Sequence, residues 1–326
     1  MSKIRRFKWV LLVLVSGAWL LGLSGCGAPT KMPTDTNQSA TNRSATNRSH
    51  QRQAQADRSS QSRSGTDRSS QAQSSADPTT QPPTIASGRL RKIAFALVAS
   101  AENSTTAYQS AYRYIEDIGD GRGYTAGIIG FTSGTGDLLQ VVQRYQKLAP
   151  ENKLTQYLPA LRQVNGTASH RGLGKPFVRA WHQASQDPKM IQAQNTIVRQ
   201  EYLDPAVSYA QRDGLSPLGQ YLYYDALVVH GPGTKAEADS FQGIRAAALK
   251  KAPTPAQGGK QATYLKAFLA ARQPVMLAET AHQDLSRLQV QRQLIAAGNF
   301  QLKLPLQWRM YGDQYHLTAA MVKQLP

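Results

Sequence analysis

The sequence has little cysteine and histidine. Its one cysteine, Cys26, lies close to the N-terminus of the 326-residue chain. One cysteine cannot form an intrachain disulfide or a cysteine-based zinc site, and no thiol nucleophile can lie in the rest of the chain. The six histidines include no His-Glu-x-x-His pattern, so the sequence predicts no metal site.

Acidic residues are also few. The chain has 20 Asp and Glu against 38 Lys and Arg, a net charge of +18, of which +11 remains in residues 89–326 once the N-terminal segments are set apart. This excess favours anionic partners such as cell-wall polymers. Nucleic acid is not expected, because no nucleic-acid-binding motif accompanies the charge. A polycationic substrate would need a locally acidic cleft, since salt screens distant charges beyond a Debye length of about 8 Å.

Residues 1–25 are typical of a bacterial lipoprotein signal peptide. Basic residues from Lys3 to Lys8 precede an apolar run that starts at Trp9, and Leu23-Ser-Gly-Cys26 resembles a lipobox. The alternative, an uncleaved membrane helix, needs about 20 apolar residues, more than this run offers. We therefore expect Cys26 to carry lipid and to anchor the protein at the extracellular face of the cytoplasmic membrane, or the protein to be secreted.

Residues 26–88 consist largely of Ser, Thr, Gln, Asn, Ala, Arg and Asp, with near-repeats such as Ala40–Ser44 and Ala45–Ser49. Such a composition buries too little apolar surface to offset the entropy of ordering, which predicts a disordered tether. Its arginines could contact anionic wall polymers, although they serve solubility equally well.

Residues 89–326 are predicted to form one compact folded body. Apolar residues from Leu90 to Ala101 recur at helical spacing and predict a helix that ends near Glu102. A second helix is expected to carry Tyr108, Tyr112 and Ile115 on one face. The segment 119–136 holds seven glycines around short β-prone pieces, which predicts a small sheet, and a further helix is expected from Asp137 until Pro150.

The glycine run fits none of the common ligand-binding loops. It lacks the Gly-Lys-Ser/Thr of a phosphate loop, and a calcium loop starting at Asp117 would need glutamate where Ile128 stands. Ser133 lacks the glycine two residues before it that a nucleophile elbow requires. What remains is a pair of carboxylates, Glu102 and Asp120, of the kind that glycoside hydrolysis requires. Such pairs also occur on solvated surfaces, so spacing alone leaves both interpretations open.

Several motifs together resemble the chitosanases of glycoside hydrolase family 46. They cover about residues 90–315 and include Ala101-Glu-Asn-Ser, Tyr114-Ile-Glu-Asp-Ile-Gly-Asp-Gly-Arg-Gly-Tyr-Thr125, Ser133-Gly-Thr-Gly-Asp137, Tyr223-Tyr-Asp225, His230-Gly-Pro-Gly and Glu279-Thr-Ala-His. The resemblance implies an α+β, mainly helical, lysozyme-like fold of two lobes, with a small sheet and a substrate cleft between the lobes. It also implies a monomer that needs no cofactor.

The resemblance further implies an endo-acting, inverting hydrolase of chitosan or glucosamine oligosaccharides. Glu102 would be the general acid and Asp120 the general base, with Thr125 holding the attacking water. Asp137 would bind the glucosamine amine, although it could also cap the following helix. Arg122 would lie beside Asp120. A supporting charge network is expected behind the cleft from Asp225, Arg272, Glu279 and Arg287. Of these four, Arg287 would lie nearest the base and would keep Asp120 ionised and oriented.

Two other functions stay open on the sequence. A lysozyme-like enzyme acting on peptidoglycan fits the membrane anchor, and a non-catalytic wall-binding lipoprotein fits the basic charge. The presence of both carboxylates disfavours the non-catalytic wall-binding protein. A peptidoglycan-cleaving enzyme of the lytic transglycosylase type needs only the acid, so the presence of Asp120 and Thr125 disfavours that type.

Overall fold

The structure is a computed structural model that describes residues 83–279 and 283–326. The predicted signal peptide, Cys26 and nearly all of the tether lie outside the described residues. Within the described ranges, no helix is both long enough and apolar enough to cross a membrane.

Helices make up most of the described chain, which confirms the mainly helical α+β class. The α-helices are α1 (Gly88–Glu102), α2 (Asp137–Leu148), α3 (Leu158–Val164), α4 (Gly174–Ala184), α5 (Pro188–Val198), α6 (Asp204–Arg212), α7 (Pro217–His230), α8 (Phe241–Leu249), α9 (Gln261–Leu277), α10 (Ser286–Ala296) and α11 (Ala319–Gln324). The short 3₁₀ helices are η1 (Tyr108–Arg113), η2 (Thr155–Tyr157) and η4 (Pro255–Gln257), and η3 (Arg199–Leu203) is a π-helical turn between α5 and α6.

Two small antiparallel sheets complete the fold. The first has the order β1 (Ile115–Asp117), β2 (Tyr124–Ala126), β3 (Phe131–Thr132), and the second is a hairpin of β4 (Leu306–Met310) and β5 (Asp313–Leu317). The first sheet forms in the glycine-rich segment, as predicted, because glycines at positive φ turn the chain tightly between its short strands.

The helix predicted between α1 and this sheet is not present in the expected form. The expected helix carrying Tyr108, Tyr112 and Ile115 is only the 3₁₀ helix η1, and Ile115 instead begins β1, where it pairs with Ala126 of β2. The two tyrosines are buried, as an apolar face requires, but the strand pairing determines the conformation of Ile115. The expected ends of the flanking helices are confirmed, since α1 ends at Glu102 and α2 ends before Pro150.

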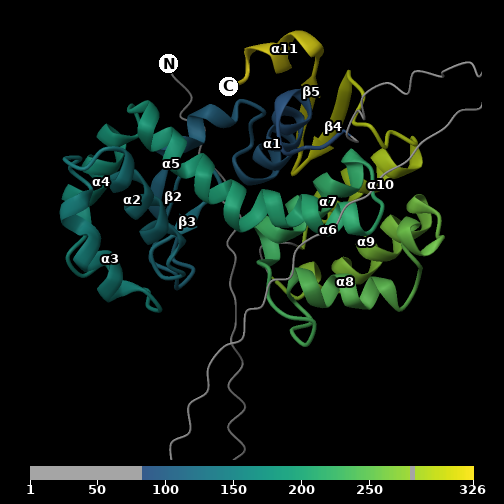
Figure 1. Ribbon diagram of the computed structural model, residues 1–326, viewed down its shortest axis with the longest axis horizontal. Coiled ribbons are helices and arrows are strands. Elements are labelled where there is room, and N and C mark those ends of the chain that lie inside the picture. Colours follow the sequence, from purple (N-terminus) through teal and green to yellow (C-terminus); the bar gives the residue numbers. More distant parts are fainter. Residues whose placement is uncertain (1–82, 280–282) are drawn as a thin grey trace, which may run out of the picture. The chain divides into compact units, whose positions relative to one another are not determined.

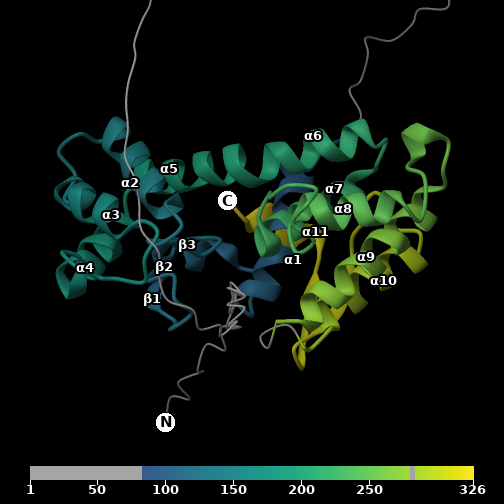
Figure 2. The ribbon, with the colours of Figure 1, turned by 90° about the horizontal axis from the view of Figure 1, so that it is seen from below.

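The elements gather in two groups within the described body. In both views α2, α3 and α4 lie with the three-stranded sheet on one side, and α8, α9 and α10 lie on the other (Figures 1 and 2). The continuous run of α5, η3 and α6 passes from the first group to the second. Figure 2 shows this run along one edge of both groups.

Helix α7 lies in the centre of the core. It is buried almost throughout, and Tyr221, Tyr223 and Tyr224 are all inaccessible to solvent, so these tyrosines are part of the core. A helix that is buried all round places every polar residue it carries inside the protein. Asp225 is therefore a buried carboxylate.

Candidate active site

Glu102 is the last residue of α1, and its side chain remains 22% exposed. Its Oε1 accepts a hydrogen bond of 2.7 Å from Nη1 of Arg287 on α10. Among the described residues no bond to Oε2 is found, so one carboxyl oxygen is anchored while the other can face a ligand.

Arg287 also binds the buried Asp225. Oδ1 of Asp225 accepts from Nη2 of Arg287 at 2.7 Å and from Nε at 3.0 Å, and its Oδ2 accepts from Nη1 of Arg272 at 2.6 Å. Burial alone would raise the pKa of Asp225, but the two guanidiniums outweigh it and hold that pKa well below its usual range. Arg287 thus forms a fixed bridge from the core carboxylate to Glu102.

Arg287 was expected to lie nearest the base and to hold it, but no hydrogen bond from Arg287 to Asp120 is found among the described residues. All three of its nitrogens bond to Asp225 or Glu102, and the carboxylate that it holds at the site is the proposed acid. The cause is the position of Arg287 on α10, which packs against α7 and so directs the side chain to Asp225 and the end of α1.

Asp120 lies in the turn between β1 and β2 and is held by Arg122. Its Oδ1 accepts from the backbone N–H of Arg122 at 3.0 Å, and its Oδ2 accepts from the guanidinium Nε and Nη2 at 2.8 Å and 2.5 Å. The Asp120 side chain is fully covered, whereas Arg122 is 25% exposed. The predicted contact of these two residues is therefore present, and it orients the carboxylate.

Thr125 lies in the middle of β2, opposite Glu116 of β1 and Thr132 of β3. It is 2% exposed, and its hydroxyl has no hydrogen-bond partner within the described chain. A buried hydroxyl in this state has an unused capacity both to donate and to accept.

Asp137 is the first residue of α2, and the cap position before it is occupied by Gly136. Its Oδ1 accepts from the backbone N–H of Thr132 at 2.7 Å and from the hydroxyl of Thr135 at 2.9 Å, and its Oδ2 accepts from the Tyr202 hydroxyl at 3.2 Å. Burial raises the pKa of Asp137 despite these bonds. Oδ1 also accepts from the backbone N–H of Leu138 in the first turn of α2 at 2.9 Å. Asp137 therefore connects the sheet to the start of α2, and Oδ2 keeps room for another donor.

The remaining network residues lie behind Glu102. Arg272 on α9 is fully buried and donates from Nε to His230 Nε2 at 3.0 Å, while Glu279, which follows α9, is nearly buried. Gln291 also joins the network, because its Nε2 donates to Asp225 Oδ2 at 2.7 Å.

Sequence reasoning missed Gln291, Tyr202 and Tyr311. Gln291 follows Arg287 by one helical turn, and this i to i+4 spacing could have identified it. Tyr202 gives no such signal, because it reaches Asp137 from 65 residues away through the π-helical turn η3. Tyr311 is half-buried, and its hydroxyl has no hydrogen-bond partner among the described residues. Burial raises the pKa of Tyr311.

No group of three metal-ligating side chains is found in residues 83–279 and 283–326. The arrangement thus offers one anchored carboxyl group at a helix end and a second on a turn, each with its own arginine. General acid and base chemistry on a sugar can use such a pair.

Known proteins resemble this chain over most of its described residues. The model of glycosyl hydrolase family 46 matches residues 96–306. A chitosanase from Streptomyces sp. (strain N174) is 57% identical over 230 residues, which cover 70% of this chain and 82% of that protein. The co-crystal structure of chitosanase OU01 with substrate aligns with a TM-score of 0.70 and 49% identity over 73% of this chain and all of that one. A Gynuella sunshinyii chitosanase in complex with chitotetraose aligns with a TM-score of 0.65 and 33% identity, covering 71% and 98% of the two chains.

Proposed function

Since this chain belongs to glycosyl hydrolase family 46 and is a chitosanase, we propose that it is an endo-acting, inverting enzyme that cleaves β-1,4 linkages between glucosamine units of chitosan. The observation that carries this proposal is the 57% identity to a chitosanase over 230 residues. The family match at residues 96–306 spans both candidate carboxylates.

In this mechanism Glu102 protonates the leaving oxygen of the glycosidic bond. The bond from Arg287 occupies Oε1, so Oε2 would carry the proton. Because Asp225 balances the charge of Arg287, the acid does not lie beside an isolated cation. The fixed bridge would hold the acid in one orientation, which general acid catalysis requires.

Asp120 would remove a proton from the water that attacks the anomeric carbon from the opposite face. Inversion needs the two carboxyl groups to lie roughly 6.5–9.5 Å apart, which leaves room for that water. The buried hydroxyl of Thr125 would help to hold it. Since the Asp120 side chain is covered, Arg122 would have to shift for water to reach the carboxylate.

Asp137 would bind the ammonium group of a glucosamine unit through the remaining lone pair of Oδ2. The Tyr202 hydroxyl would keep the carboxylate in place. A carboxylate at this position favours the free amine over its acetylated form, which has no charge.

We expect Asp120→Asn to lower the rate of chitosan hydrolysis about a hundredfold or more, because the amide cannot accept a proton from water. Azide is already an anionic nucleophile and needs no base to attack the anomeric carbon. Added azide should therefore restore part of the rate of the Asp120→Asn enzyme. The product should be a glycosyl azide of inverted configuration, detectable by NMR. Asp239→Asn changes an exposed aspartate elsewhere and is the matched control. A normal rate for Asp120→Asn would end its assignment as the base.

Activity on chitosan should be compared with activity on purified peptidoglycan. The same enzyme preparation should release reducing ends from chitosan and none from the wall polymer. Wall lysis at a comparable rate would favour the muralytic alternative.

The cellular location is a separate proposal, which rests on residues outside those described. We propose that the protein is a lipoprotein held at the outer face of the membrane through Cys26, with residues 26–88 as a tether. A flexible chain of about 60 residues has a root-mean-square reach of roughly 40–45 Å, enough to project into a cell wall.

Cys26→Ser should abolish labelling of the protein by a fatty-acid probe in the producing cell, because serine offers no thiol for the lipid. Ser24→Ala keeps a small residue before the cleavage site and should still be labelled. Labelling of the Cys26→Ser protein would contradict the lipoprotein assignment.

A further inference from the structure

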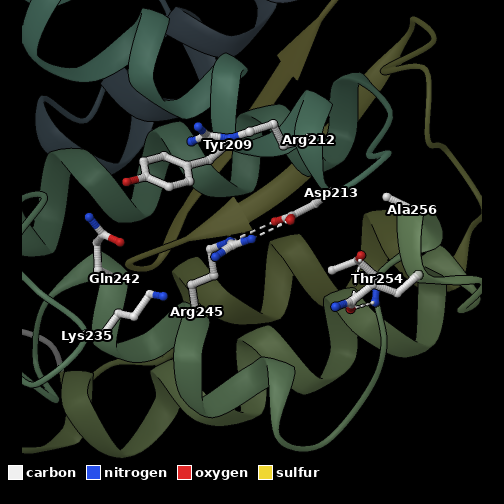
Figure 3. Close-up of a pocket in the computed structure, with 9 residues that line it drawn as sticks. Tyr209, Arg212, Asp213, Lys235, Gln242, Arg245, Thr254 and Ala256 are labelled. Carbon is white, nitrogen blue, oxygen red and sulfur yellow. Dashed lines mark hydrogen bonds and ion pairs between the residues drawn. The ribbon is translucent and has the colours of Figure 1, made fainter.

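A second polar pocket lies between α6, α8 and the turn η4. Its volume is about 390 Å³, and its lining carries three cationic side chains, Arg212, Lys235 and Arg245, against one carboxylate, Asp213. Figure 3 shows Arg212 and Tyr209 on one side of this space, with Lys235 and Arg245 approaching it from the other. None of these side chains contacts Glu102, Asp120 or Asp225 in the described chain.

The one carboxylate in the pocket is already neutralised. Asp213 accepts from Arg245 Nε at 2.8 Å and Nη2 at 2.5 Å, and its Oδ2 also accepts from the Tyr223 hydroxyl at 2.6 Å. Its side chain is only 5% exposed. Arg245 Nη1 makes no hydrogen bond within residues 83–279 and 283–326, so it can donate outward while Asp213 holds the guanidinium in place.

The other two cations have no acidic partner within the described residues. Arg212 lies over the ring of Tyr209 at 4.4 Å from the centroid, and Arg245 lies 5.5 Å from the same centroid. Two guanidiniums beside one ring concentrate positive charge at this end of the pocket, and a nearby anion would offset it. Lys235 is exposed and extends toward Arg245 (Figure 3).

The neutral groups of the pocket add donors. Gln257 uses Oε1 to accept from the backbone N–H and the hydroxyl of Thr254, which leaves its amide nitrogen available. Gln242 contributes a further side-chain amide. Glu237, in the same loop as Lys235, accepts from the backbone N–H of Thr234 and does not line the pocket.

From this excess of donors we propose that the pocket between α6 and α8 binds a phosphate-type oxyanion through Arg212, Lys235 and Arg245. Arginine pairs with phosphate oxygens in a bidentate manner, and the several oxygens of a phosphate can contact three cations at once, which a carboxylate with two oxygens does less well. A cationic glucosamine polymer would be repelled, so this is not a subsite for chitosan. The site is independent of the proposed catalytic mechanism. Either free phosphate or the phosphate groups of an anionic polymer could supply the ligand.

The test is isothermal titration of the full chain with inorganic phosphate and, separately, with polyphosphate, at constant ionic strength. The double variant Arg212→Gln/Lys235→Gln removes two exposed charges and leaves the Arg245 pair with Asp213 intact. Lys303→Gln/Lys323→Gln removes two exposed charges elsewhere and is the matched control. Binding should weaken at least about tenfold in the first variant and stay unchanged in the second.

Binding of inorganic phosphate that depends on the pocket residues would identify a site for the free ion. Binding of polyphosphate alone, with the same dependence, would identify the polymer as the source, and both results support the site. If both double variants lost the same affinity, the effect would come from net charge alone and the proposal would be overturned. The proposal would also be overturned if neither inorganic phosphate nor polyphosphate bound to the wild-type protein. Hydrolysis of chitosan in phosphate-free buffer should be the same in all three proteins, which separates this test from that of the catalytic residues.

Discussion

Glu102→Gln should reduce chitosan hydrolysis by about a hundredfold to ten-thousandfold, the usual contribution of a general acid. Glutamine has nearly the same volume as glutamate, and its Oε1 can still accept the bond from Arg287. The amide nitrogen cannot deliver a proton to the leaving oxygen. The loss should therefore fall on the chemical step, without a loss of structure.

The measurements are the rate of reducing-end release, the affinity for a glucosamine oligosaccharide and the melting temperature. Only the rate should change. Glu151→Gln, at an exposed glutamate in the turn after α2, is the control and should match the wild type in all three. A Glu102→Gln enzyme within tenfold of the wild-type rate would remove Glu102 from the acid role.

Arg287→Ala should lower both stability and activity. It leaves Asp225 in the core with fewer charged partners and removes the anchor of Glu102. Removing one member of a buried charged set costs roughly 3–5 kcal/mol, and a protein of this size loses about 2–4 °C in melting temperature per kcal/mol. We therefore expect a fall of about 10 °C.

The pH dependence distinguishes this role from a purely structural one. Loss of a neighbouring cation makes a carboxyl group harder to ionise. The alkaline limb of the pH-rate profile, where the acid loses its proton, should therefore move to higher pH in Arg287→Ala. Had Arg287 bonded Asp120 as the sequence suggested, the acidic limb would move instead.

Arg287→Lys and Arg179→Ala are the matched variants. Lysine keeps the positive charge but cannot reach Asp225 and Glu102 together through a planar fork, so it should recover stability only in part. Arg179 is exposed on α4, and its removal should change neither property. An Arg287→Ala protein with wild-type melting temperature and an unshifted profile would show that the bridge to Glu102 does not act in catalysis.

The dependence of folding stability on pH in the acidic range follows in part from the pKa of Asp225. Its pKa is below the ordinary value in the folded state, so it contributes stability that is present above the pKa of an unfolded aspartate. That contribution is lost only as the pH falls through the depressed folded value. The buried network therefore stays charged under the mildly acidic conditions in which chitosan dissolves.

Local pattern was enough for much of the fold. Helical spacing predicted α1 with Glu102 at its end, and the glycine run predicted the small sheet. Both follow from interactions between near neighbours in the chain, which the order of residues displays directly. The same reasoning failed at Ile115, because a strand partner 11 residues away determined its conformation.

Motifs in the sequence also indicated the family and most of the candidate site. They gave Glu102, Asp120 and Arg122, and the bond between the last two is local because they lie two residues apart. The hydrogen-bond partners of the more distant charged residues were not contained in the motifs.

Only the tertiary structure decided the partners of the distant residues. Arg287 reaches Glu102 across 185 residues, and Arg245 reaches Asp213 across 32, so each pairing depends on which faces of packed helices meet. Periodicity shows that a helix has a buried face, but it does not show which buried face lies opposite. For the same reason the amino-acid sequence shows only a net charge of +18, whereas the packing of α6 against its neighbours brings part of that charge together in one pocket.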